Sequence, residues 1–229
     1  MQGKVVFVTG ADGGLGRFVT QAFLDAGATV VGTSTKIQQS AFSNSRFTAI
    51  AARISNLESA QSLVSQITSR FGRLDVLAHT VGGFAGGTSV ADTDDATFQK
   101  MMDMNLNSVF HAVRATLPAL RRSGNGRIIA VGSRAAVEPG AGVGAYSASK
   151  AAMVSLIRTV AAENKDAGVR ANVILPGTMD TPANREAMPK ADPSKWVNPA
   201  SIASLMVWLA SDAANDVNGA VIPVYGTEG

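Results

Sequence analysis

The sequence predicts an α/β fold in which seven parallel strands form one sheet with helices on both faces. Short apolar, β-rich runs alternate with longer helical stretches along the chain, an order that implies right-handed crossovers and a sheet covered on both sides. No linker, repeat or low-complexity segment divides the 229 residues. A composition of 46% hydrophobic and 16% charged residues is typical of a well-packed globule. We therefore expect a single domain over residues 1–229.

The predicted elements follow in order. Residues 5–8 and 173–175 are wholly apolar, as expected of strands buried on both faces. The first helix places Phe18, Ala22 and Phe23 on one side. The predicted strands cover residues 5–8, 29–33, 47–50, 76–79, 127–131, 170–175 and 220–224, and the helices cover 15–26, 56–71, 94–121, 146–166 and 199–211.

A glycine-rich turn separates the first strand from the first helix. It reads Thr9-Gly10-Ala11-Asp12-Gly13-Gly14-Leu15-Gly16. Strand, glycine turn and helix in this order typically cradle the phosphates of a dinucleotide, because glycines admit the pyrophosphate and the helix N-terminus supplies N–H donors. The spacing is not Gly-x-Gly-x-x-Gly, and a turn without a ligand is the alternative. In a parallel sheet a ligand lies at the carboxyl ends of the strands, where this turn, Gly82, Ser133 and residues 176–181 all fall.

Tyr146 and Lys150 are four residues apart in a predicted helix, so the phenol and the ammonium lie on one face. A nearby cation favours phenolate, and we expect it to lower the pKa of the tyrosine. A tyrosine tuned in this way can exchange a proton as a carbonyl and an alcohol interconvert. The alternative is a solvated helix face.

With these motifs the chain resembles the short-chain dehydrogenase/reductase family over nearly its whole length. The family's Thr-Gly-x3-Gly-x-Gly falls on residues 9–16, its tyrosine and lysine on Tyr146 and Lys150, and its strand-end serine on Ser133. Its helix asparagine falls on Asn105, and its Pro-Gly turn on Pro176-Gly177. The resemblance implies a Rossmann-type, doubly wound sheet and an NAD(P)-dependent oxidoreductase that acts on a small-molecule carbonyl or alcohol.

The resemblance also implies a role for each site residue. Tyr146 would be the general acid/base, Lys150 would lower its pKa and hold the nicotinamide ribose, and Ser133 would donate to the substrate oxygen. Asn105 would position a water that links Lys150 to solvent. The implied cofactor-binding residues are Thr9, Gly10, Asp12, Gly14, Leu15, Gly16, Thr33, Ser34, Thr35, Ile54, Gly82, Tyr146, Lys150, Pro176, Gly177, Met179 and Thr181.

Some residues have a structural alternative. Asn105 could bond local backbone, and Ser133 could be a strand-end turn residue. His79 stands where the family usually has asparagine, and an imidazole bonded to backbone beside the cofactor is favoured there over a catalytic acid.

The choice of cofactor depends on the end of the second strand, which reads Thr33-Ser34-Thr35-Lys36 without a carboxylate. A carboxylate there would bond the ribose of NAD and repel a 2′-phosphate, so the sequence favours NADP, with NAD as the alternative. Asp12 argues for NAD, since many NADP-using relatives carry a basic residue at this point.

A lid over the substrate is predicted at about 178–199, a segment with four prolines that cannot form one helix. Arg185 and Trp196 would meet an anionic group and a planar ring, or Trp196 would only pack the segment onto the core. Residues 81–87, 175–185, 188–192 and 225–229 look like quinonoid dihydropteridine reductase, so reduction of a planar pterin-like substrate is the second hypothesis. A lapsed enzyme that senses dinucleotides is the third.

Other functions are disfavoured. The chain has no cysteine and two distant histidines, so no metal site is expected, and it lacks the basic block of a nucleic-acid binder. No apolar run could span a membrane and no signal peptide opens the chain, which predicts a cytoplasmic protein. A homo-oligomer, tetramer or dimer, is expected from apolar residues on two long helices: Met101, Met102, Val109, Phe110, Val113, Met153 and Ile157. The alternative places all of these in the intramolecular core.

Overall fold

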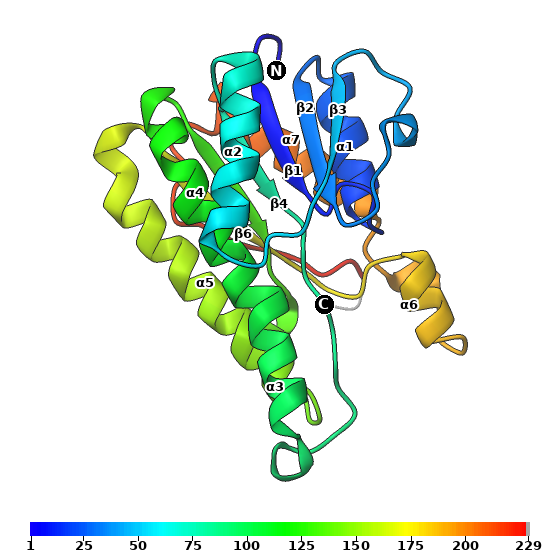
Figure 1. The fold of residues 1–229 in the computed structure, drawn as a ribbon. Helices are drawn as coiled ribbons and strands as arrows, with labels where there is room; N and C mark the ends of the chain where they lie inside the picture. The colour runs from blue at the N-terminus through cyan, green and yellow to red at the C-terminus, as the bar shows by residue number, and fades with distance from the viewer. Residues whose placement is uncertain (228–229) are drawn as a thin grey trace.

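The computed structural model describes residues 1–227 and confirms the predicted fold (Figure 1). Seven strands form one sheet in the order β3-β2-β1-β4-β5-β6-β7, and every neighbouring pair is parallel. Each predicted strand is present, although Ala220 lies outside β7. The strands are β1 (Val5–Thr9), β2 (Thr29–Ser34), β3 (Phe47–Ala51), β4 (Val76–His79), β5 (Arg127–Val131), β6 (Arg170–Pro176) and β7 (Val221–Val224).

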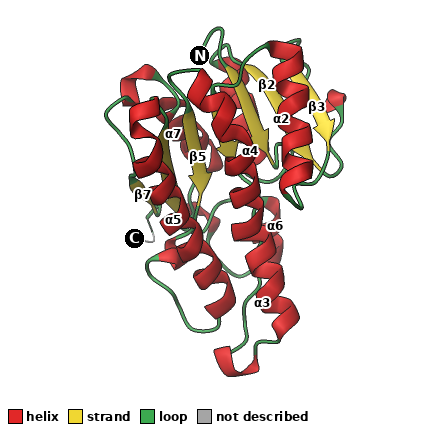
Figure 2. Ribbon diagram, turned by 60° about the vertical axis from the view of Figure 1, so that its left-hand side comes forward, coloured by secondary structure: helices red, strands yellow, loops and turns green. Residues whose placement is uncertain are grey.

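Helices cover both faces of the sheet, as predicted (Figures 1 and 2). On one face α2 (Leu57–Phe71), α4 (Ser108–Arg122) and α5 (Gly144–Asn164) bury residues such as Leu63 and Ile157 against the strands. On the other, α1 (Gly16–Asp25) and α7 (Pro199–Leu209) enclose a second core. Within residues 1–227, no helix has both the length and the apolar character needed to cross a bilayer.

The predicted single helix over 94–121 is divided, which corrects that expectation. It consists of α3 (Asp95–Met102), a π-helical turn (Asp103–Asn107) and α4. In the π turn the Ser108 N–H donates to the Asp103 carbonyl, one residue further back than in an α-helix. The Ser108 hydroxyl donates to the Met104 carbonyl at 2.7 Å. The widened turn carries Asn105, which is fully buried.

The apolar residues that motivated an oligomer are mostly internal. Met101, Val109, Val113, Met153 and Ile157 are each at most 3% exposed, so the intramolecular alternative holds for these five. Phe110 on α4 is 41% exposed, and its ring lies beneath the Arg114 guanidinium. The argument for a partner surface on these helices therefore rests on Phe110 and on Phe98 of α3, which is 45% exposed.

The sheet topology determines where a site can form. β1 lies between β2 and β4, so the chain winds in opposite directions on either side of the gap between β1 and β4. In folds of this kind the loops that leave the carboxyl ends of two such strands diverge, and ligands bind in the crevice between them. The segment after β6 rises from the same edge, with α6 (Pro182–Ala187) standing apart from the sheet (Figure 1).

Candidate active site

The glycine turn, residues 9–16, depends on glycine at both ends. Gly10 has a φ of +71°, a conformation that L side chains rarely adopt. A Cβ on Gly16 would stand 1.8 Å from the Gly10 carbonyl oxygen, so the turn closes only without a side chain there. In the described chain no side chain caps the start of α1, whose N–H groups lie at this turn. The local geometry suits a phosphate group.

The segment after β6 meets the glycine turn from the other side. A Cβ on Gly14 would lie 3.2 Å from Cγ2 of Thr181, which is buried. β6 ends at Pro176, and a Cβ on the following Gly177 would lie 3.0 Å from the Tyr225 carbonyl oxygen. The predicted cofactor residues of these two segments are therefore neighbours, although they are more than 150 residues apart in the sequence.

At the end of β2, Thr33 differs from its predicted role. Its hydroxyl donates to the Ile50 carbonyl at 2.7 Å and the residue is 2% exposed, so this hydroxyl ties β2 to β3. The Ser34 hydroxyl accepts from the Lys36 N–H at 3.3 Å, and Thr35 and Lys36 are exposed. These three polar residues are the ones left at the open end of the strand.

Asp12, another predicted cofactor residue, faces a cavity of about 490 Å³ between α1 and the segment after β2. Arg17 and Gln21 on α1 line the same cavity, with Phe18, Ala41 and Phe42. Ile54, predicted to lie near the adenine, is partly buried and packs against the core beneath α2. The cavity thus brings an acidic and a basic side chain together next to the glycine turn.

The proposed catalytic residues converge at the end of β5. Ser133 follows this strand, and its side chain lies near enough to the phenol of Tyr146, near the start of α5, to lower the pKa of that phenol. One helical turn later, Lys150 donates from Nζ to the Val131 carbonyl at 3.0 Å. The sequence motif and the strand-end serine are therefore brought into one cluster.

Protonation in this cluster differs from the expectation. Burial raises the pKa of Tyr146, and the hydrogen bond from Ser133 only partly offsets this effect. Burial also lowers the pKa of Lys150 to about 8. Lys150 does not lower the tyrosine pKa as the helical spacing predicted, because loss of hydration dominates and the ammonium is directed at Val131. The phenol is consequently protonated at neutral pH.

Asn105 links the loop after β4 to α5. Its amide pairs with both backbone groups of Gly83, accepting at 2.9 Å and donating at 3.0 Å, and it donates to the Ser149 hydroxyl at 3.0 Å. These partners are distant in sequence, so the alternative of a bond to local backbone does not hold. A Cβ on Gly82 would stand 3.0 Å from both Asn105 Oδ1 and Lys150 Nζ. Glycine at position 82 therefore keeps the space between these two atoms open.

His79 is wholly buried beneath the site. Its Nδ1 lies 3.0 Å from the Thr9 hydroxyl and its Nε2 lies 3.4 Å from the Ser108 hydroxyl, so its partners are side chains and not the predicted backbone. Burial, with a smaller contribution from the Lys150 charge, lowers its pKa to about 3. The imidazole is neutral at ordinary pH and connects the glycine turn to the π-helical turn.

The predicted lid residues are engaged within their own segment. A β-bridge between Met179 and Val197 closes the neck of this segment. The Arg185 guanidinium donates to both carboxylate oxygens of Asp180, at 2.6 and 2.8 Å. Trp196 is only 7% exposed, so the packing alternative describes it better than a ring-binding role.

Two site residues escaped the sequence analysis. Ser149 bridges Asn105 to α5, and its hydroxyl donates to the Tyr146 carbonyl at 2.7 Å. Its position within the Tyr-x-x-x-Lys run, three residues after the tyrosine, was the available signal. Phe84 lies beside the Tyr146 ring, with centroids 5.0 Å apart. A large aromatic residue between two pairs of glycines was its signal.

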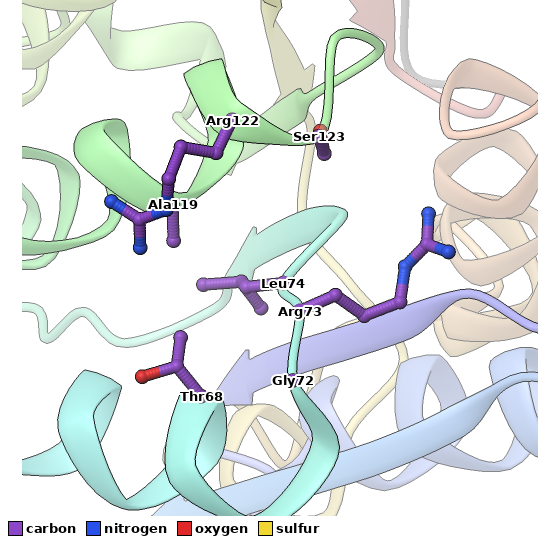
Figure 3. Close-up of a pocket in the computed structure, with 7 residues that line it drawn as sticks. All are labelled: Thr68, Gly72, Arg73, Leu74, Ala119, Arg122 and Ser123. Carbon is purple, nitrogen blue, oxygen red and sulfur yellow. The ribbon is translucent and has the colours of Figure 1, made fainter.

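A cavity of about 310 Å³ lies elsewhere (Figure 3). It is formed where α2 and α4 end and just before β4 begins, which is the opposite edge of the sheet from Ser133. The cavity is therefore separate from the cluster described above. Its lining consists of Thr68, Gly72, Arg73, Leu74, Ala119, Arg122 and Ser123.

Comparison with known proteins decides the family. The family model described as short chain dehydrogenase matches residues 4–192. The chain belongs to the short-chain dehydrogenase/reductase family. The chain is 31% identical to the short chain dehydrogenase/reductase astE of Aspergillus oryzae, over 98% of this chain and 94% of the relative. It is 28% identical to the 3-oxoacyl-[acyl-carrier-protein] reductase FabG of Vibrio cholerae, over 99% and 97%.

Solved structures agree with this family assignment. The crystal structure of gox2181 superposes with a TM-score of 0.92 at 28% identity, over 98% of this chain and 95% of that one. A 3-ketoacyl-(acyl-carrier-protein) reductase from Brucella melitensis, crystallised with NADH, superposes with a TM-score of 0.87 at 24% identity, over 98% of both chains. The second likeness concerns the fold alone. This short-chain dehydrogenase/reductase is thus a Rossmann-type member of a family of oxidoreductases.

Proposed function

We propose that this protein is an NAD(P)-dependent oxidoreductase that interconverts a carbonyl and an alcohol, with Tyr146 as the general acid/base. The observation that carries the proposal is the grouping of Ser133 with Tyr146, whose pKa the serine side chain lowers, and with Lys150 one helical turn further on. The cluster stands at the carboxyl edge of the sheet, where parallel α/β folds bind their ligands.

The residues around the crevice fit a dinucleotide. The glycine turn and the start of α1 would hold the pyrophosphate, since a side chain on Gly16 is excluded and no side chain caps this helix end within the described residues. Lys150 would hold the nicotinamide ribose across the space that Gly82 leaves open. Thr181, beside Gly14, would lie at the nicotinamide end. When bound, the nicotinamide supplies or accepts the hydride.

The chain's own residues would handle the proton. With its pKa raised, the Tyr146 phenol is protonated at neutral pH and can donate to a carbonyl oxygen as that oxygen gains charge. Ser133 would donate a second hydrogen bond to the same oxygen. Donors fixed before the reaction stabilise developing charge without reorganisation, which is usually the largest contribution to catalysis. Asn105 would hold a water on the route from Lys150 to solvent.

For the cofactor, NADP is favoured over NAD. The support is the group of Ser34, Thr35 and Lys36 at the open end of β2, which carries hydroxyls and a cation where a carboxylate would repel a 2′-phosphate. A comparison of kcat/KM for NADPH and NADH tests this choice, and preference for NADH would overturn it.

The function is tested with a panel of small dicarbonyls and each nucleotide, on wild type and Tyr146→Phe. Loss of the phenol hydroxyl is expected to lower turnover by at least about a hundredfold with nucleotide affinity unchanged. Tyr225→Phe is the matched control, because it removes the hydroxyl of the other tyrosine and keeps the ring under Arg134. Wild-type turnover by Tyr146→Phe would remove this residue from the mechanism. Nucleotide binding without turnover of any carbonyl would favour the sensor hypothesis.

The protein is also proposed to form a homo-oligomer. The exposed Phe110 on α4 and the exposed Phe98 on α3 support a contact with a second copy. Light scattering at micromolar concentration is expected to give a multiple of the 23.5 kDa chain mass, and a monomer mass would contradict the proposal.

A further inference from the structure

Phe84 is an exposed aromatic residue that touches the proposed catalytic tyrosine. It follows β4, and 65% of the residue is exposed to solvent. Its ring lies edge to face against Tyr146, with centroids 5.0 Å apart and planes at 74°. A single exposed hydrophobic residue is common on protein surfaces. An exposed ring packed against the ring of the proposed catalytic tyrosine would contact a substrate bound at that tyrosine.

The ring is held in place by the loops around it. A Cβ on Gly86 would stand 2.8 Å from Cζ of Phe84 and 3.1 Å from Cγ1 of Val143, so glycine at this position makes room for the ring. The Gly87 N–H donates to the Gly142 carbonyl at 2.9 Å, which joins the loop after β4 to the loop before α5. The residue before Phe84 is fixed by its two bonds to Asn105. Phe84 is thus part of an ordered wall beside Tyr146, formed by the loop after β4 and the loop before α5.

This wall carries no charge. Residues 80–91, which surround Phe84, include no acidic or basic side chain, and neither do residues 139–149 on the facing loop and the start of α5. A charged substituent placed here would lose hydration without gaining an ion pair. An uncharged ring would instead cover exposed aromatic surface, which is favourable.

We propose that Phe84 is a specificity-determining residue that receives a flat, uncharged ring of the substrate next to the reacting carbonyl. The proposal rests on the proposed function, because it takes Tyr146 as the group that meets the carbonyl oxygen. The class of substrate it predicts is an aryl or similar cyclic carbonyl compound.

The test compares two dicarbonyls that share a reacting group, 1-phenyl-1,2-propanedione and 2,3-butanedione. Phe84→Ala is expected to lower kcat/KM for the phenyl compound by about tenfold and to change the value for butanedione by less than about twofold. Phe84→Tyr, which keeps the ring, is expected to retain the preference. Trp208→Ala is the matched control, because Trp208 is 43% exposed near the end of α7, which covers the face of the sheet opposite α5.

An equal loss on both dicarbonyls would overturn the proposal, since it would show that Phe84 acts only by supporting Tyr146. Unchanged kinetics on both would overturn it as well. Binding of acetophenone, followed by ligand-observed NMR, separates this proposal from the proposed function because it requires no turnover. If wild type turns over no carbonyl but Phe84→Ala binds acetophenone more weakly than wild type does, the ring site stands and the proposed reaction is rejected. Equal acetophenone binding by wild type and Phe84→Ala would reject the ring site alone.

Discussion

Burial of the Lys150 ammonium in the proposed site should lower the stability of the folded protein, and this can be tested. Lys150 is 5% exposed, and the described hydrogen bond of its ammonium goes to the Val131 carbonyl. Burial lowers its pKa from 10.5 to about 8. The folded pKa thus lies about 2.5 below the ordinary value, which corresponds to a loss of about 3 kcal/mol of folding free energy at neutral pH, where the lysine is charged. Replacing the side chain by methionine, which is similar in length and uncharged, removes this cost.

We therefore expect Lys150→Met to be more stable than wild type at pH 7. In this variant the Val131 carbonyl loses its hydrogen-bond donor, which costs about 1 kcal/mol. The free energy of unfolding should therefore rise by about 2 kcal/mol. For a chain of this size that corresponds to a rise in Tm of about 4–8 °C. The same change removes the group proposed to hold the ribose, and turnover should fall to the background. Stability and activity would then move in opposite directions.

The dependence on pH gives the sharper result. Because the folded pKa lies below the unfolded one, the unfolded chain binds more protons between about pH 8 and 10.5. Wild-type stability should therefore rise with pH across this window, and the advantage of Lys150→Met should shrink.

Urea unfolding at pH 7 and pH 10, at one protein concentration, measures both values. Exposed Lys100→Met is the control and should change stability by less than about 0.5 kcal/mol. A variant less stable than wild type at pH 7, or an advantage that does not vary with pH, would refute the reasoning.

Three further predictions concern the turn, the buried imidazole and the lid. Gly16→Ala should weaken nucleotide binding by about ten- to a hundredfold, because its Cβ would displace the turn, whereas Gly140→Ala, with open space around its Cβ, should not; equal affinities by calorimetry would contradict this. His79→Asn should lose less stability than wild type as pH falls below 6.5, because the wild-type imidazole takes up a proton when unfolded but stays neutral in the folded chain down to about pH 3. The same dependence of stability on pH in both proteins would count against this prediction. Cofactor should protect residues 178–199 from limited proteolysis, and identical digestion with and without nucleotide would argue against a lid.

Much of the fold and of the site could be predicted because the decisive signals are local. The glycine turn lies within eight residues, and Tyr146 and Lys150 lie one helical turn apart. Ser133 could be placed at the same edge because parallel strands bring their carboxyl ends together, and the family resemblance implied its role. These inferences use only the spacing of residues along the chain and the fact that parallel strands end at the same edge of a sheet. They require no knowledge of side-chain packing.

The errors arise where distant parts of the chain decide the outcome. The division of the 94–121 helix accompanies bonds from Asn105 to Gly83 and Ser149, which no helical periodicity contains. The Thr33 hydroxyl is bonded to β3, a partner that depends on strand register. The pKa of Tyr146 rises because its surroundings exclude water, and burial is a property of the folded chain that the spacing to Lys150 does not reveal.

These distant contacts also explain how one buried cation can be kept in the site. Lys150 carries its charge in a core that contains a second titratable group, His79, and two like charges so close would raise the cost of burial. The imidazole avoids this by staying neutral, with its Nδ1 at the Thr9 hydroxyl and its Nε2 at the Ser108 hydroxyl. Asparagine, the usual family residue at this position, carries no ionisable group and would be neutral whatever its hydrogen-bond partners. Burial and the Lys150 charge keep His79 neutral, and the hydroxyls of Thr9 and Ser108 supply hydrogen-bond partners for its two ring nitrogens.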